Sequence, residues 1–400
     1  MAKQVTYGYD MSISYIVKKD ETEIPKESIK SIIVSYDYER MFCPIIYVAC
    51  NLDISIYNKM INNKDIGKVS LDIQVFNNSD TTKTKKSYIK GHFNYFFPRF
   101  DDDSPEAEED DEKNGVTYKQ VYMGLLDIDI INDNNVKVIN DVFLNSNTMS
   151  IVYHYICKQK VIIEPFDYNP EHKLLIVPPI TGINNLIEYM NQMSAFYKTG
   201  YRYFRDFKRT YILSNEGNGI EISGSKQYKS VHINVEGSKN NDNISILGVV
   251  KNKKNKCYEI QITSSLANID IDKTSDHMYN MYYGVTQTGD VKKKKFNINP
   301  DKKSKTKPKL YRIFNNNKHI IPAVANEDST TGYIVTLSKS DIDMSIISLH
   351  KEYTINFEGD KEKSGKYLLV GKREVFQQNN EEFAGNIEMT FKKIANKKDK

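Results

Sequence analysis

The chain has 400 residues, of which 39% are hydrophobic and 27% charged, and its formal net charge is +4. This length allows two or three domains with cores of their own, and the composition is typical of a globular protein. No apolar run reaches the roughly 18–20 residues of a membrane-spanning helix, and the first residues lack the basic and apolar parts of a secretory signal. We therefore expect a protein that stays in a cytoplasm until it is assembled into something larger.

Four cysteines are present, and no two of them form a CxxC pair: Cys43, Cys50, Cys157 and Cys257. A zinc site needs close cysteine pairs or a cysteine–histidine cluster, and apart from His154 the histidines are scattered. We expect reduced, packed thiols and no metal site.

Residues 1–145 predict a first β-barrel domain. Between residues 46 and 56, apolar side chains alternate with polar ones, which is typical of a strand with one buried face. Similar runs cover residues 32–38, 69–75, 88–97 and 121–131. Five such runs joined by polar turns indicate a sandwich or a small barrel.

An acidic segment interrupts this domain between its fourth and fifth runs. Asp101–Glu112 has the sequence DDDSPEAEEDDE, with nine acidic residues in twelve. Pro105 and the lack of large apolar residues predict a loop. A loop of this kind cannot hold two carboxylates at the fixed separation that glycosidases need, so we expect no catalysis there. Calcium binding is the alternative, although the alternating ligands and glycine of a calcium loop are missing.

Residues 146–216 predict a helix-containing middle domain, because the apolar period changes. The first helix is predicted from residues at helical spacing: Met149, Val152, Tyr153 and Ile156. Asn147 or Thr148 is its expected N-cap. After a proline-rich connector, a second apolar stripe runs over Ile183–Tyr197, with Gly200 as the expected left-handed C-cap. We interpret this stripe as core.

The stretch Tyr201–Arg209 (YRYFRDFKR) mixes aromatic and basic residues and predicts a strand. Stacking rings and cations are what single-strand nucleic-acid binders use. The alternative is a strand whose aromatic side chains pack while its arginines reach a surface or an interface. Because acidic residues nearly balance basic ones, we favour packing and expect no specific nucleic-acid partner.

Residues 217–400 predict a second β-barrel domain. Its alternating runs cover residues 231–235, 244–246, 258–262, 353–357 and 383–391. It also contains a basic loop, residues 292–309, and a Lys-rich C-terminal tail. The expected fold class is mainly β (α+β), with two similar β-barrel domains and a small helical insert between them. The charged interruption in each β region suggests a duplication.

No enzyme motif is present. Gly217-Asn218-Gly219 begins like GxGxxG, but Ile222 occupies the third glycine position, and no Gly-Lys-Ser/Thr follows any glycine-rich loop. Ser223 and Ser225 lack the flanking glycines of a nucleophile elbow. We expect no catalytic, cofactor-binding or metal-binding residues, no cofactor and no enzyme activity.

Three stretches carry a resemblance to a known family. The first is Ile33–Tyr38 followed by Met41-Phe42-Cys43-Pro44 and the strand Ile45–Ile56. The second is Leu175–Pro179 leading into Leu186–Met190, and the third is Phe196–Gly200 followed by the strand to Leu213. In this order of elements, about the first 215 residues resemble the baseplate hub (tail hub) proteins of contractile-tailed bacteriophages.

The resemblance implies a ring of three subunits that adapts a six-fold tail tube to a three-fold spike. The chain would be a structural virion protein and a homotrimer, with the tube, the spike and other baseplate proteins as partners. It would reach the virion after assembly in the host cytoplasm. The alternatives are another baseplate or injection-machine component, such as a wedge or sheath initiator, or a cell-wall hydrolase or DNA-binding protein. Charge segregation further suggests that the acidic loop 101–112 or the basic loop 292–309 meets an oppositely charged neighbour.

Overall fold

A computed structural model describes most of the chain. The described residues are 6–98, 111–113, 116–156, 160–216, 219–220, 228–237, 249–272, 278–285, 291–297, 309–313, 332–380 and 382–394. Within them, no helix is long and apolar enough to cross a membrane.

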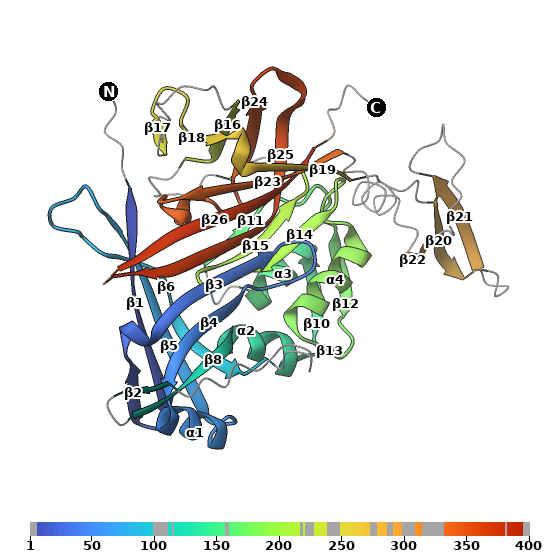
Figure 1. Cartoon of the computed structure of the whole chain (residues 1–400). Coiled ribbons are helices and arrows are strands. Elements are labelled where there is room, and N and C mark those ends of the chain that lie inside the picture. Colours follow the sequence, from blue (N-terminus) through green and yellow to red (C-terminus); the bar gives the residue numbers. More distant parts are fainter. Residues whose placement is uncertain are drawn as a thin grey trace.

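A closed β-barrel of eight antiparallel strands organises the fold (Figure 1). In barrel order, the strands are β25 (Asp360–Asn379), β3 (Ile29–Asp37), β4 (Ile45–Asp53), β8 (Val116–Asp127), β6 (Lys86–Phe96), β5 (Gly67–Asn77), β1 (Tyr7–Val17) and β26 (Glu382–Lys393), which pairs again with β25. Two short strands extend it, β2 (Asp20–Ile24) beside β1 and β7 (Asp111–Lys113) beside β8. The predicted alternation is confirmed, because every second side chain is buried from Ile32 to Tyr36 in β3 and from Ile46 to Leu52 in β4. The expectation of a mainly β fold with a barrel is therefore confirmed.

Two predicted strands end earlier than their apolar alternation suggests. The strand predicted to reach Ile56 stops at Asp53, whose carboxylate accepts a hydrogen bond from the backbone N–H of Ser55 and so begins helix α1 (Ile54–Asn62). The strand predicted to reach Ile131 stops at Asp127, which caps the short helix α2 (Ile128–Ile131) in the same way. In both places the aspartate offers the backbone a helix start, and this outweighs the apolar pattern.

A second curved sheet shares the strands β25 and β26 with the barrel. On one side it continues from β25 through β24 (Glu352–Phe357), β16 (Ser230–Glu236), β18 (Cys257–Thr263) and β17 (Val250–Asn252). On the other side it continues from β26 through β23 (Gly332–Ser340) and β19 (Ala267–Asp272). The Lys339 ammonium donates to the Gln261 carbonyl at 3.1 Å and links β23 to β18. One continuous apolar core runs through the barrel and this sheet.

A β-bulge in β25 lets this one strand serve both sheets. Before the bulge, all four residues from Tyr367 to Val370 are buried, and Tyr367 and Leu369 belong to the main core. After the bulge, the buried residues are Lys372, Glu374 and Phe376. The bulge lies between Leu369 and Gly371, so the side chains change face as the strand passes from the curved sheet into the barrel. The division of the chain at residues 145 and 216 remains a prediction, but two of the barrel strands come from the last predicted domain.

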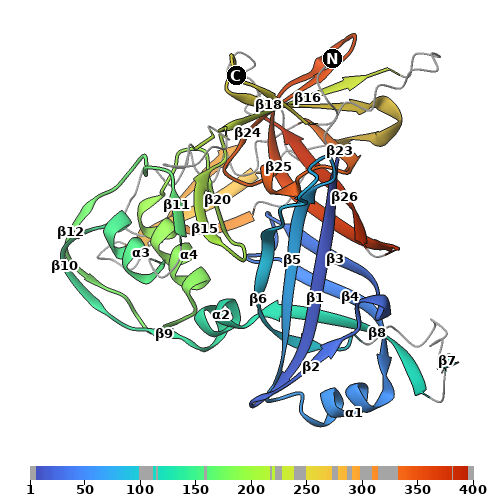
Figure 2. The same cartoon turned by 90° about the vertical axis from the view of Figure 1, so that its left-hand side faces the viewer.

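The middle part of the chain forms a smaller unit with its own core (Figure 2). Its elements are β9 (Val138–Ile139), β10 (Val142–Asn147), α3 (Thr148–Ile156), β11 (Lys160–Ile163), β12 (Glu171–Ile176), β13 (Ile180–Thr181), α4 (Ile183–Ser194), β14 (Tyr201–Arg205) and β15 (Arg209–Ser214). Asn147 caps α3 as predicted, since its side chain accepts from the N–H of Ser150. The buried face of α3 differs from the predicted one, because Tyr153 is exposed while Tyr155 packs inside.

Helix α4 confirms the predicted stripe but ends earlier than expected. Ile183, Leu186, Ile187 and Met190 are buried, as expected of a core face. The helix ends at Ser194, and the left-handed cap is Ala195 (φ 52°) rather than Gly200. The Asn191 side chain accepts from the Phe196 N–H, and the Phe196 ring stacks on Phe166 at 4.3 Å. Packing of this ring into the core therefore decides where the helix stops.

The two charged loops fall largely outside the described residues. Residues 101–110 and 298–308 are not described, so the predicted loops cannot be compared there. Residues 292–297, predicted as loop, instead form most of strand β21 (Val291–Asn297). This strand lies beside β20 (Met278–Val285), which also pairs with β22 (Lys309–Ile313).

Candidate functional site

The basic, aromatic stretch forms a hairpin rather than one strand. Strands β14 and β15 are joined by a turn at Asp206, whose carboxylate accepts from the backbone N–H groups of Lys208 and Arg209. We predicted that its arginines reach a surface or an interface. Arg202 and Arg205 are only 8% and 5% exposed, so neither lies on the surface of the single chain. Phe204 is fully buried, so aromatic packing is confirmed.

The two buried arginines tie the middle unit to the barrel. Arg205 forms an ion pair with Asp133 at 2.6 Å, and its backbone N–H donates to the Phe42 carbonyl in the turn after β3. Arg202 donates to the carbonyls of Ser214 at 3.1 Å and Leu369 at 3.5 Å, and therefore joins β15 to β25. Burial of charged groups at these positions is compensated by hydrogen bonds and by one ion pair.

A cavity of about 620 Å³ lies at this junction. Its walls come from the turn after β3, from α4 and β14, and from β25 and β26; they are Tyr38, Glu39, Arg40, Met41, Phe42, Asn184, Glu188, Tyr201, Arg202, Tyr203, Asn215, Leu368 and Lys392. The walls therefore combine charged, amide and aromatic groups from all three parts of the chain. Burial lowers the pKa of the Arg202 guanidinium to about 10, which still leaves it charged at neutral pH.

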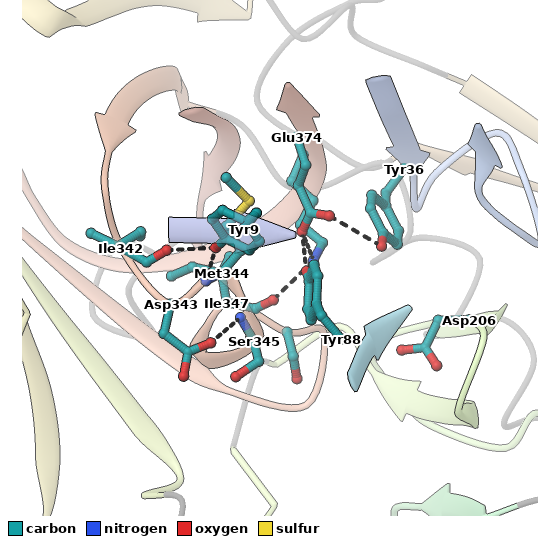
Figure 3. A network of polar contacts seen from close by, with 12 residues as sticks. Tyr9, Tyr36, Tyr88, Asp206, Ile342, Asp343, Met344, Ser345, Ile347 and Glu374 are labelled. Atoms are coloured by element: carbon teal, nitrogen blue, oxygen red, sulfur yellow. Dashed lines mark hydrogen bonds and ion pairs between the residues drawn. The ribbon is translucent and has the colours of Figure 1, made fainter. Parts of the chain in front are cut away.

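A buried ion pair lies inside the barrel (Figure 3). Lys372 and Glu374 lie two residues apart on β25, so both side chains point to the same face, and their charged atoms are 2.6 Å apart. Tyr88 and Tyr36 donate to the two Glu374 oxygens at 2.5 Å and 3.4 Å. The Lys372 ammonium also donates to the Ile347 carbonyl at 3.2 Å and lies 4.2 Å from the centre of the Tyr36 ring.

The same network fixes the connection between β23 and β24 against the barrel. Tyr9 donates to the Ile342 carbonyl at 2.7 Å and accepts from the Met344 N–H at 3.2 Å, as Figure 3 shows. Burial raises the pKa values of Tyr9, Tyr36 and Tyr88 well above 10, so their hydroxyls stay protonated and act as donors. The network is thus suited to holding strands and a loop together.

The described residues offer little to covalent or metal chemistry. Burial raises the pKa of the Cys43 thiol to about 11 and that of Cys50 to about 12, which keeps both protonated and weakly nucleophilic. No group of three potential ligands among His, Cys, Asp and Glu is present within the described part of the chain.

Two apolar faces stand out among the exposed residues that the structure describes. In the ribbon of β10 and β12, Phe143 and Leu175 face the helices, while the other face carries two cross-strand pairs, Val142–Ile176 and Leu144–Leu174. These four side chains, the ribbon face, are between 58% and 66% exposed. Figure 2 shows the ribbon outside α3 and α4.

The second exposed face, the barrel face, consists of Tyr47, Phe96 and Tyr122, which are 36–47% exposed. Residues 47 and 96 both lie opposite Gly124 in neighbouring strands. The Phe96 ring covers this glycine so closely that a Cβ there would lie 2.2 Å from the ring. The lack of a side chain at position 124 therefore lets the Phe96 ring pack directly against the barrel wall.

A protein-family comparison decides where the chain belongs. The model of the Bacteriophage PBS1 gene 109 protein family matches residues 3–394, which is nearly the full length. The chain belongs to this family. No curated protein sequence matches it.

The solved structures that are similar to this chain include tail proteins. The tail protein from Neisseria meningitidis MC58 is 9% identical, with 96% of this chain and 97% of that chain covered and a TM-score of 0.51. The 43 kDa tail protein of prophage MuSo2 from Shewanella oneidensis is 9% identical over 94% and 98% of the two chains, with a TM-score of 0.46. The prophage tail protein gp18 from Listeria monocytogenes EGD-e is 10% identical over 95% and 94%, with a TM-score of 0.40. The expected resemblance to bacteriophage tail proteins is confirmed.

Sequence reasoning missed the two polar features of this family member, the ion pair on β25 and the junction cavity. The ion pair escaped notice because Lys372, Arg373 and Glu374 are three charged residues in a row, which in a local pattern look solvent-exposed. The cavity is built from residues that lie far apart in the sequence, which no local pattern brings together.

Proposed function

We propose that this chain is a structural component of a phage baseplate, a hub that forms a trimeric ring and joins the tail tube to the central spike. The family match and the tail-protein fold support a structural role in the tail. The partners would be further copies of the chain, the tube, the spike and other baseplate proteins, in the virion. The proposal of a ring is supported by the two exposed apolar faces, the ribbon face and the barrel face.

The ribbon face is the observation that carries the proposal. A two-stranded ribbon that is apolar on both faces is expected to be buried on both faces. Among the described residues, only the side with Phe143 and Leu175 is covered. Contiguous exposed apolar side chains of this kind mark protein contacts. A ring of identical subunits needs two different faces that fit each other, and the aromatic barrel face offers a second one.

The test is the mass of the purified chain measured by light scattering over a range of concentrations. We expect a trimer, either alone or together with a spike protein. Changing Leu144→Lys and Leu174→Lys together should yield a folded monomer, because both side chains are exposed and only the contact between copies is lost. Leu266→Lys, at a 49% exposed position outside both faces, is the matched control and should remain trimeric.

A wild-type chain that stays monomeric at every concentration and never joins tail proteins would contradict the hub. A trimer that co-purifies with sheath or wedge proteins but not with tube and spike proteins would favour another baseplate role instead.

A further inference from the structure

The junction cavity carries unbalanced positive charge. Of the five charged side chains in its walls, Lys392 lies 3.7 Å from Glu39, and Glu188 accepts a hydrogen bond from Gln192. Arg40 and Arg202 have no carboxylate within ion-pair distance among the described residues. Arg40 is exposed at the rim, whereas Arg202 is 8% exposed and lies deeper in the wall. Two carbonyls accept hydrogen bonds from the Arg202 guanidinium, and the more distant charges of Glu164 and Glu39 favour its charged form. A bound carboxylate would add a direct charge-assisted contact to it.

The same walls hold polar atoms without partners. Within the described part of the chain, the Nε of Arg202 and the side-chain oxygens of Asn184 and Asn215 are buried and make no hydrogen bond. Such atoms are rare in folded proteins, and three of them line one cavity. A small shift of these side chains would bring a donor and two amide groups to a ligand that carries both acceptors and donors.

We propose that the junction cavity binds an acidic segment of a polypeptide, whose carboxylate pairs with Arg202 and Arg40 and whose backbone amides meet Asn184 and Asn215. A polypeptide is favoured over a single small acid for two reasons. The volume of about 620 Å³ lies in the range that encloses ligands of several residues, and amide side chains match the alternating donors and acceptors of a backbone. The occupant is the acidic segment 101–112 of a neighbouring copy of this chain, because its nine carboxylates complement the cationic walls.

The test uses a labelled peptide with the sequence of residues 99–113, RFDDDSPEAEEDDEK, and fluorescence anisotropy. The protein is the full chain in which the nine acidic residues of 101–112 are changed to Asn or Gln, so that its own segment cannot compete. We expect this peptide to bind and its amidated counterpart, RFNNNSPQAQQNNQK, to bind at least tenfold more weakly. Free succinate should not displace the peptide at equal carboxylate concentration.

In this background, Arg40→Gln and Arg202→Gln should each weaken peptide binding about tenfold, which is one lost charge-assisted contact. Arg40 is exposed, so its replacement tests the proposal even if Arg202→Gln fails to fold. Arg373→Gln removes an exposed arginine outside the cavity and should bind as the parent does.

Failure of the acidic peptide to bind, equal binding of the neutral peptide, or unchanged affinity in the Arg40 variant would each overturn the proposal. A scrambled acidic peptide distinguishes the sources of the ligand. Weaker binding of the scrambled peptide supports the segment of a neighbouring copy, and equal binding would overturn that assignment. A chain that is monomeric in light scattering and still binds the peptide would contradict the hub proposal but not this one.

Discussion

At the scale of single residues, the barrel interior depends on the charged pair on β25. Glu374 is fully buried and receives three donors, from Lys372, Tyr36 and Tyr88. Burying two charges costs more than their attraction repays unless further hydrogen bonds satisfy them, and here the two tyrosines do so. The pair therefore depends on the tyrosines of β3 and β6, which reach Glu374 from two other strands.

We expect Lys372→Met to lower the free energy of unfolding by about 3–5 kcal/mol, because it leaves Glu374 buried without its cation. The double change Lys372→Met with Glu374→Leu should cost less than the single one, since no charge is then stranded. Chemical denaturation measures both. Glu382→Gln breaks an exposed pair with Lys83 (42% and 49% exposed) and should cost under about 1 kcal/mol. A double variant less stable than the single one would contradict this reasoning.

His350 makes the stability depend on pH. Its ring is 2% exposed, stacks on Tyr211 at 6.0 Å and contacts the Ser348 hydroxyl. Burial, with the charges of Lys351 and Arg209, lowers its pKa from 6.5 to about 3. Between these two pH values, the unfolded chain binds a proton at His350 and the folded chain does not. The contribution of His350 to the free energy of unfolding is therefore complete above pH 6.5 and is lost as the pH falls toward 3.

We expect the wild-type chain to lose about 2 kcal/mol more between pH 7 and pH 5 than a His350→Gln variant does. The comparison requires denaturant unfolding curves of both proteins at each pH. The readout is the difference in pH slope, which is independent of any loss of stability common to all pH values. Parallel slopes would show that His350 is not the responsible group.

At the scale of elements, the entry into α4 depends on a single glycine. Gly182 has φ 87° and ψ 151°, a region that is open almost only to glycine. A Cβ at this position would also lie 2.0 Å from the carbonyl oxygen of Asn134. The chain can therefore turn from β13 into the helix only without a side chain here.

Gly182→Ala should lower the free energy of unfolding by more than about 1–2 kcal/mol, which is the cost of a positive φ at an alanine. The excess comes from the clash of the new Cβ with the Asn134 carbonyl. Gly359→Ala is the matched control, since Gly359 has φ 77° but open space around its Cα, and it should cost only the conformational term. Thermal unfolding of the two variants gives the comparison. Equal losses would mean that the backbone around Asn134 relaxes freely.

At the scale of the whole molecule, the barrel is closed by pairing between strands from the first and the last parts of the chain. Strands β1 to β8 supply six of its members and leave β1 and β3 as edges, which β26 and β25 then cover. At its bulge, β25 passes from the curved sheet into the barrel, and one continuous apolar core runs through both. The two sheets are therefore expected to fold as one cooperative unit.

A fragment of residues 1–145 should accordingly lack a cooperative unfolding transition, because it presents two long unpaired edges and an open core. The full chain, measured in the same way by circular dichroism during denaturation, is the control. A sharp transition in the fragment would instead favour the division of the chain at residue 145.

The amino-acid sequence by itself determined most of the strands and the apolar face of α4, because alternation and helical spacing are local consequences of which side chains avoid water. It also carried the resemblance to phage tail proteins. Only the tertiary structure decided the rest. The partners of β25, the burial of Arg202, Arg205 and Glu374, and the end of α4 depend on contacts between residues far apart in the chain. Charged residues such as these look solvent-exposed in a local pattern. Their desolvation is compensated only by the hydrogen-bond and ion-pair partners that folding brings to them.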